Sequence, residues 1–151
     1  MKIQSLEDLK KISQTYEKQI YAPAGIKVNI GMASCGIAAG AQAALKKAAE
    51  NYKDNPDIEI CQTGCIGFCE QEPLVEIMAT DKPRVLYQNM TEDKIIDAIE
   101  GYMAGDFAKN KKWILGQLKD PRSLLDDDLE NPLNGVEPIE DIPFMEDDPF
   151  Y

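Results

Sequence analysis

Apolar residues recur at helical spacing in the first twenty residues of the chain. Leu6 and Leu9 lie one turn apart, and Ser5 followed three residues later by Asp8 has the spacing of a weak capping box. The pattern predicts an N-terminal helix that runs through about Gln19.

Further along the chain, short runs of apolar and β-branched residues are bounded by turn-forming residues, which is typical of strands. Four strands are predicted: IKVNI at 26–30, DIEI at 57–60, PLVEIMA at 73–79 and RVLYQ at 84–88, the last two joined through TDKP as a hairpin. Two helices are predicted between and after them: the alanine-rich segment 36–52, and a segment capped by Thr91 that ends at Gly105. This order of elements indicates a small α/β sandwich with a mixed four-stranded sheet.

The last 32 residues differ from the rest in charge. The 151-residue chain has a net charge of −11, and residues 120–151 hold eleven acids against a single base, Arg122. Repeated prolines exclude long helices there, yet the segment keeps many apolar residues. We therefore expect an extended acidic strap that lies on a partner or on the chain's own body.

The charge balance also limits the partners. Nucleic acids and anionic membranes require a basic surface, so neither is expected to bind a chain of this charge. The N-terminal segment is charged throughout, and no apolar stretch approaches the length of a membrane span. A cytoplasmic location is expected, and in a reducing cytosol cysteines are more often metal ligands or redox groups than disulfides.

The four cysteines are Cys35, Cys61, Cys65 and Cys69. Cys35 directly follows a predicted strand in the glycine-containing segment GMASCGIAAGA, and Cys65 and Cys69 lie in TGCIGFC between two further strands. Loops that leave the same end of a sheet can converge on one point. We expect at least these three thiolates to meet there, among backbone N–H groups that favour an anionic, sulfur-ligated centre.

The kind of centre follows from ligand chemistry. The spacing C-x3-C-x3-C is an imperfect match to the paired knuckles of structural zinc sites. The chain contains no histidine, which excludes a c-type haem motif, a Rieske centre and a Cys–His catalytic pair. Iron–sulfur clusters need only thiolates and tolerate longer spacings.

Three segments together resemble a known family. SCGIAAGAQAAL, QTGCIGFCEQEPLVEI and VLYQNMTEDKIIDAI are similar to the thioredoxin-like [2Fe–2S] ferredoxins. The similarity is greater to one version of this family, which occurs in soluble NAD(P)-linked hydrogenases, including bifurcating ones, and in complex I-like oxidoreductases. There it forms either a separate small subunit or the N-terminal domain of the NADH-binding flavoprotein subunit. It covers roughly residues 26–105.

The resemblance implies a ligand set. It identifies Cys35, Cys65 and Cys69 as ligands of one [2Fe–2S] cluster. The family's standard pattern has a further cysteine at the end of the first strand, where this chain reads Ile30-Gly31-Met32. Cys61 is the candidate for that fourth position; the alternative is that it continues the apolar strand as a core residue.

The resemblance also implies a thioredoxin-like fold and a function. The expected domains are an N-terminal helix and lead-in at 1–25, the [2Fe–2S] domain at 26–105, and a C-terminal helix or turn with the acidic docking tail at 106–151. The implied function is one-electron transfer in a cytoplasmic multisubunit oxidoreductase, with no complete active site on this chain. FMN and NAD(P) are expected on a flavoprotein partner subunit, with a hydrogenase or another iron–sulfur catalytic subunit as a further candidate partner.

Two other functions compete with this interpretation. The first is a zinc-stabilised or metal-free structural module that holds a larger complex together through its tail. The second is a thiol–disulfide redox protein, which is disfavoured because the chain lacks C-x-x-C at a helix start.

Overall fold

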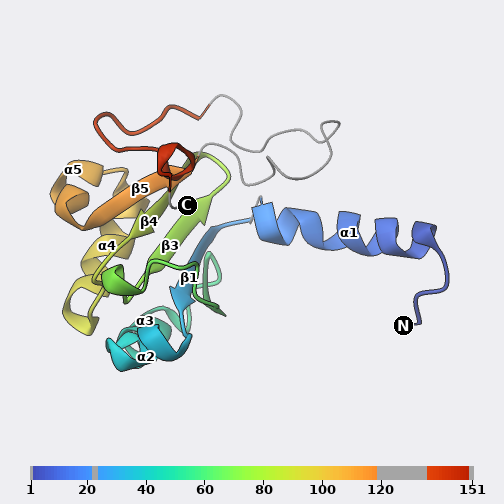
Figure 1. Cartoon of the computed structure of the whole chain (residues 1–151), viewed down its shortest axis with the longest axis horizontal. Coiled ribbons are helices and arrows are strands. Elements are labelled where there is room, and N and C mark those ends of the chain that lie inside the picture. The colour runs from blue at the N-terminus through green and yellow to red at the C-terminus, as the bar shows by residue number, and fades with distance from the viewer. Residues whose placement is uncertain (1, 22–23, 119–135, 150–151) are drawn as a thin grey trace.

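A five-stranded mixed sheet lies at the centre of the computed structural model, which describes residues 2–21, 24–118 and 136–149 (Figure 1). In spatial order the strands are β2 (Ile58–Thr63), β1 (Ile26–Gly31), β3 (Val75–Ala79), β4 (Lys82–Tyr87) and β5 (Ile114–Leu118). β1 and β2 are parallel, and every other neighbouring pair is antiparallel.

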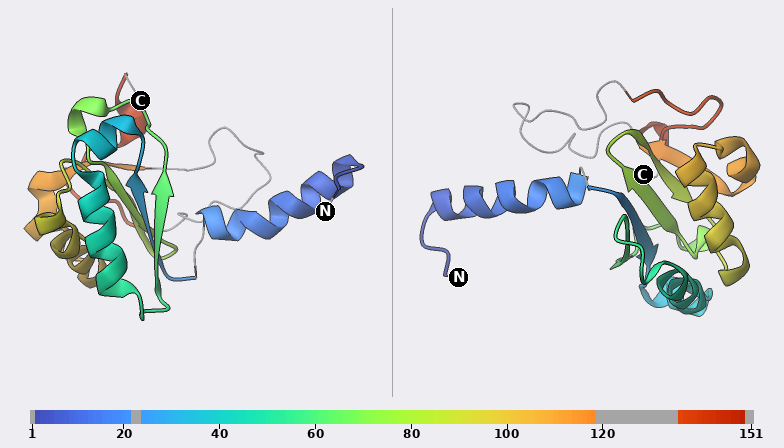
Figure 2. Two further views of the ribbon diagram at one scale, coloured as in Figure 1. Left: turned by 90° about the horizontal axis from the view of Figure 1, so that it is seen from below. Right: turned by 180° about the vertical axis from the view of Figure 1, so that it is seen from behind.

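Two of the helices cover one face of this sheet (Figure 2). They are α3 (Ala41–Tyr52) and α4 (Glu92–Ala104), which pack against each other. The remaining helices are α1 (Leu6–Tyr21), α2 (Ser34–Ala38) and α5 (Phe107–Asn110), and the 3-10 turns are η1 (Cys69–Gln71), η2 (Lys111–Trp113) and η3 (Met145–Asp147).

Alternation along the strands gives the sheet two apolar faces. Val75, Ile77 and Val85 point into the main core beneath α3 and α4. Small buried alanines on α3 let that helix lie close to the strands: Ala41, Ala44 and Ala48. The opposite face carries a smaller cluster made by Leu74, Leu86, Leu118 and Met145.

Much of the predicted secondary structure is confirmed. The four predicted strands, their hairpin and the helix between Thr91 and Gly105 are all present. The capping box at the start of α1 forms, since the Ser5 N–H donates to Asp8 Oδ2 at 3.0 Å and the Asp8 N–H donates to Ser5 Oγ at 3.2 Å. Thr91 occupies the N-cap position of α4 without a capping hydrogen bond from its side chain.

The predicted four-stranded sheet is wrong by one strand. Residues 114–118 form β5, which pairs with β4 and places Gly116 opposite Leu86. The strand is short and contains a glycine, so its sequence pattern is weak, and its pairing with β4 determines its conformation. Trp113, interpreted from the sequence as an interface anchor or part of a terminal helix, lies in η2 and packs against the main core.

The predicted single helix at 36–52 is also wrong. It is divided into α2 and α3 at Gly40, whose φ of 100° is left-handed and stops the first helix. Because α2 begins at Ser34, Cys35 lies inside its first turn instead of just before a long helix.

The described end of the acidic segment, residues 136–149, lies on the chain's own body. Gln117 is 2% exposed; its side-chain amide donates to the carbonyl oxygens of Ile139 and Ile142 and accepts from the Ile139 N–H. Gly116 leaves room for Met145, because a Cβ added there would lie 2.5 Å from the Met145 sulfur. The acidic cluster Asp126–Asp128 lies outside the described residues.

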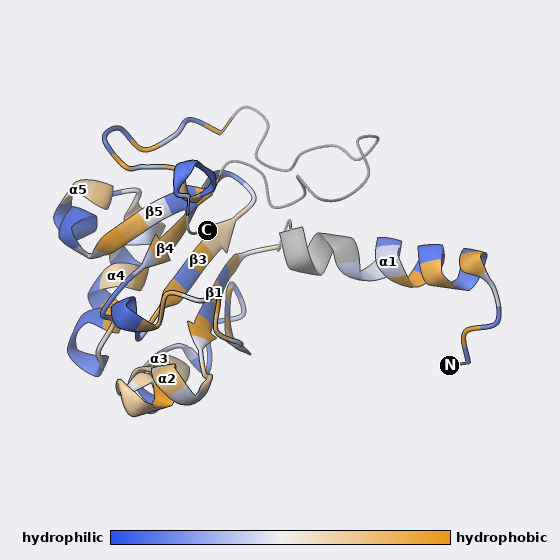
Figure 3. Cartoon of the chain, in the orientation of Figure 1, coloured by the Kyte–Doolittle hydropathy of each residue, from blue (hydrophilic) through white to orange (hydrophobic). Residues whose placement is uncertain are grey.

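α1 projects away from the sheet, and its apolar face is exposed (Figures 1 and 3). Leu6 is 70% exposed and Leu9 is 48% exposed. Among the described residues, no helix is long and apolar enough to cross a membrane.

The Gln117 contacts predict a stability effect. Gln117→Ala removes three buried hydrogen bonds and leaves backbone groups unpaired, so we expect the free energy of unfolding to fall by about 2–3 kcal/mol. Urea unfolding followed by circular dichroism measures the change. The exposed Gln62→Ala is the control and should stay within about 0.5 kcal/mol of the unsubstituted protein. An equal decrease in the free energy of unfolding in both variants would contradict the structural role of Gln117.

Candidate metal centre

The site lies where the parallel strands β1 and β2 end. Gly31, the last residue of β1, is in register with Thr63, the last residue of β2, so the two following loops leave the sheet at one edge. Backbone hydrogen bonds hold the loops together there. The Met32 N–H donates to the Thr63 carbonyl oxygen, and the Gly31 N–H donates to the Leu74 carbonyl oxygen, each at 2.9 Å.

Three cysteine side chains meet at this edge. Cys35 comes from α2, Cys65 from the loop after β2, and Cys69 from the start of η1. Their Sγ atoms all lie within 4.8 Å of one another, and those of Cys65 and Cys69 are 3.5 Å apart. The predicted convergence of the two loops is therefore confirmed.

Glycines allow the backbone to approach this closely. Gly67 has a φ of 102°, a conformation that disfavours side chains, and its N–H donates to Cys65 Sγ at 3.3 Å. Gly36 packs directly on the end of β1, since a Cβ added there would lie 2.3 Å from the Gly31 carbonyl oxygen. Any other residue at position 36 would push α2, and Cys35 with it, away from the sheet.

The three thiols have unequal proton affinities. The pKa of Cys35 is raised to about 12. The main cause is a hydrogen bond with Cys65, and the second is burial of the thiol. The Gly67 N–H is the main cause that lowers the pKa of Cys65 below its usual value. Cys65 therefore ionises before Cys35 in the metal-free protein, and a metal that binds both must displace the Cys35 proton.

This donor set fits an iron–sulfur cluster. The centre contains thiols from two loops, and a backbone N–H group donates to one sulfur. Thiolates with N–H donors are the surroundings that such clusters use. Cys65 and Cys69 are exposed and Cys35 is half-buried, so one side of the centre faces solvent.

No protein-family model matches the sequence. Among curated proteins, the NADP-reducing hydrogenase subunit HndB from Solidesulfovibrio fructosivorans is 28% identical over 104 residues, which are 67% of this chain and 82% of HndB. Among solved structures, a thioredoxin-like [2Fe–2S] ferredoxin from Aquifex aeolicus matches with a TM-score of 0.54 and 15% identity, over 64% of this chain and 96% of that ferredoxin.

The chain has a thioredoxin-like fold, similar to that of this ferredoxin. The resemblance inferred from the sequence is thus confirmed, together with the α/β class and the N-terminal helix. In this ferredoxin fold the three close thiols occupy the exposed edge formed by the two glycine-containing loops.

Cys61, the candidate fourth ligand, is not in the group of close sulfurs. It lies within β2 opposite Asn29, and alternation places it on the same face as Glu59, away from the core-facing Ile60. Burial and the neighbouring Glu59 raise its pKa. The ferredoxin fold therefore brings together three of the four predicted ligands.

Sequence reasoning missed one residue at the site, Glu72. Its side chain is 6% exposed, and its Oε1 accepts from the Cys35 thiol at 3.6 Å. In the sequence Glu72 looks like its neighbour Glu70, which is exposed, and only the path of the chain after η1 distinguishes them. The Glu72–Pro73 peptide bond is cis.

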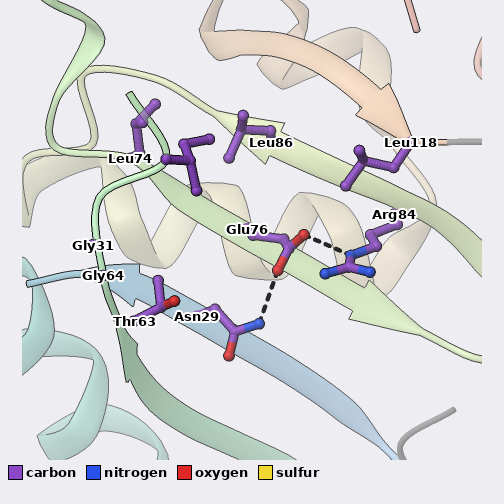
Figure 4. A pocket seen from close by; sticks show the side chains of 10 residues that line it. Asn29, Gly31, Thr63, Gly64, Leu74, Glu76, Arg84, Leu86 and Leu118 are labelled. Carbon is purple, nitrogen blue, oxygen red and sulfur yellow. Dashed lines mark hydrogen bonds and ion pairs between the residues drawn. The ribbon is translucent and has the colours of Figure 1, made fainter. Parts of the chain in front are cut away.

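A cavity of about 180 Å³ lies beside the ends of β1 and β2, on the face of the sheet opposite α3 and α4 (Figure 4). Its polar wall is a paired network in which Asn29 Nδ2 donates to Glu76 Oε2 at 2.8 Å and Arg84 forms an ion pair with Glu76. Gly31 and Gly64 contribute to the wall, while the cysteines are not among its lining residues. The cavity is therefore separate from the metal centre.

Proposed function

We propose that the protein is a one-electron carrier that holds one [2Fe–2S] cluster and serves as a subunit of an NAD(P)-linked oxidoreductase of the hydrogenase type. The convergence of Cys35, Cys65 and Cys69 at one edge of a ferredoxin fold carries the proposal. The similarity to HndB, named as a subunit of an NADP-reducing hydrogenase, supports the choice of complex.

The residues of this chain hold the cluster and leave one side of it exposed. When bound, the cluster supplies a centre that accepts and releases one electron. The three cysteines fix its position, the Gly67 N–H stabilises negative charge on Cys65, and the exposed edge brings the centre within reach of a partner. We assign no proton transfer to these residues.

The surface around the centre suits a docking protein. Ile37 on α2 and Ile66 on the loop after β2 are both 47% exposed, so apolar side chains lie close in sequence to the thiols of Cys35 and Cys65. The exposed apolar face of α1 adds a second contact surface. We propose that the partner is the flavoprotein subunit that binds FMN and NAD(P)H, because the sequence of this chain contains no glycine-rich phosphate loop.

Serine substitutions test the proposed ligands. Cys35→Ser, Cys65→Ser and Cys69→Ser should each lose or strongly shift the visible absorbance of anaerobically purified protein, because a weaker oxygen ligand replaces a thiolate. Iron and acid-labile sulfide are assayed on the same samples. The exposed neighbour Ser34→Ala is the control and should keep the original spectrum.

A variant that retains the full spectrum and iron content would remove that cysteine from the ligand set. Colourless protein that contains stoichiometric zinc, even when made with cluster-assembly support, would favour the structural module.

The partner assignment has its own test. Dithionite should bleach the visible absorbance of the isolated chain, whereas NADH and NADPH should leave it unchanged because the flavin and nicotinamide sites lie elsewhere. Adding the co-purified flavoprotein subunit should allow one of the two nucleotides to bleach it, as followed by anaerobic absorbance. Reduction of the isolated chain by either nucleotide would contradict the assignment.

A further inference from the structure

Among the described residues, the group of close side chains has one ligand fewer than a [2Fe–2S] cluster needs. Such clusters take four protein ligands, and three thiols are brought together here. Cys61 lies on β2 outside that group. We propose that the carboxylate of Glu72 is the fourth ligand, an inference that rests on the proposed function.

The carboxylate of Glu72 lies beside the cysteine group. Its carboxylate lies against the end of β1, because a Cβ added at Gly31 or at Gly36 would be 3.1 Å from Oε2. Oε1 contacts the Cys35 thiol at 3.6 Å, and the Leu74 N–H donates to Oε2 at 2.7 Å. The backbone thus fixes one oxygen while the other faces the cysteine group.

The surroundings of Glu72 favour a bound cation. The side chain is 6% exposed, and none of the ion pairs among the described residues includes it. A buried carboxylate without a cation is costly, and a metal-bound Cys35 places a second negative charge beside it. An iron ion bound by both groups would compensate both charges.

The chemistry of the cluster permits this ligand. Rieske centres replace two thiolates on one iron with imidazoles, so the [2Fe–2S] core accepts ligands other than cysteine. Carboxylates also bind non-haem iron in other proteins. Ligands of two different irons lie farther apart than ligands of one iron. Glu72 Oε1 contacts Cys35, yet Glu72 is not a member of the group of close sulfurs. It is therefore suited to complete the coordination of the iron that Cys35 binds.

Mössbauer spectroscopy of the full chain, enriched in ⁵⁷Fe and oxidised, tests the proposal without any substitution. A cluster with three thiolates and one carboxylate has two chemically different ferric sites, so we expect two distinct quadrupole doublets of equal area. Glu72→Cys supplies a fourth thiolate and should bring the two doublets close together. Two nearly equivalent, all-thiolate sites in the unsubstituted protein would overturn the proposal.

Matched variants supply the second measurement. Glu72→Gln should lose most of its iron and sulfide, with circular dichroism used to verify the fold. Glu70→Gln removes the same charge from an exposed position beside Cys69, and Cys61→Ser removes the other candidate ligand. Both should retain iron, sulfide and doublets.

Loss of the cluster in Cys61→Ser, or an unchanged spectrum in Glu72→Gln, would contradict the assignment to Glu72 and leave the electron-carrier function standing. Absence of iron and sulfide from the unsubstituted protein would overturn the proposed function, and this inference with it. The two failures are therefore distinguishable.

Discussion

The parallel pairing of β1 and β2 is the constraint on which the site depends. It places Gly31 beside Thr63, so two loops separated by about thirty residues of chain start from the same edge of the sheet. An antiparallel pair would send the two loops to opposite ends of the sheet. The helix α3, held against the strands by its buried alanines, forms the crossover that makes this pairing possible.

Close packing on one side and exposure on the other define the centre. Gly36 rests on the end of β1, and Gly67 turns its N–H toward Cys65, so the backbone around the sulfurs is tightly arranged. Cys65 and Cys69 nevertheless remain exposed. A carrier requires both features, since the ligands must stay fixed during the redox change while a partner approaches the cluster.

The sequence predicted those parts of the fold that depend on local pattern or spacing. The capped helices, the hairpin and the convergence of Cys35, Cys65 and Cys69 follow from such patterns. The fifth strand depends on pairing with β4, and the break at Gly40 depends on a backbone conformation that helix propensity does not indicate. The role of Glu72 is likewise not visible in the sequence, because its side chain becomes buried only when the chain after η1 turns back under α2.

Electron paramagnetic resonance of the anaerobically purified chain after dithionite reduction tests the central claim most directly. Iron and acid-labile sulfide should be assayed on the same sample. A bound cluster predicts an S = 1/2 signal with about two irons and two sulfides per chain. Protein made with cluster-assembly support that shows neither signal nor sulfide would contradict the assignment of an electron carrier.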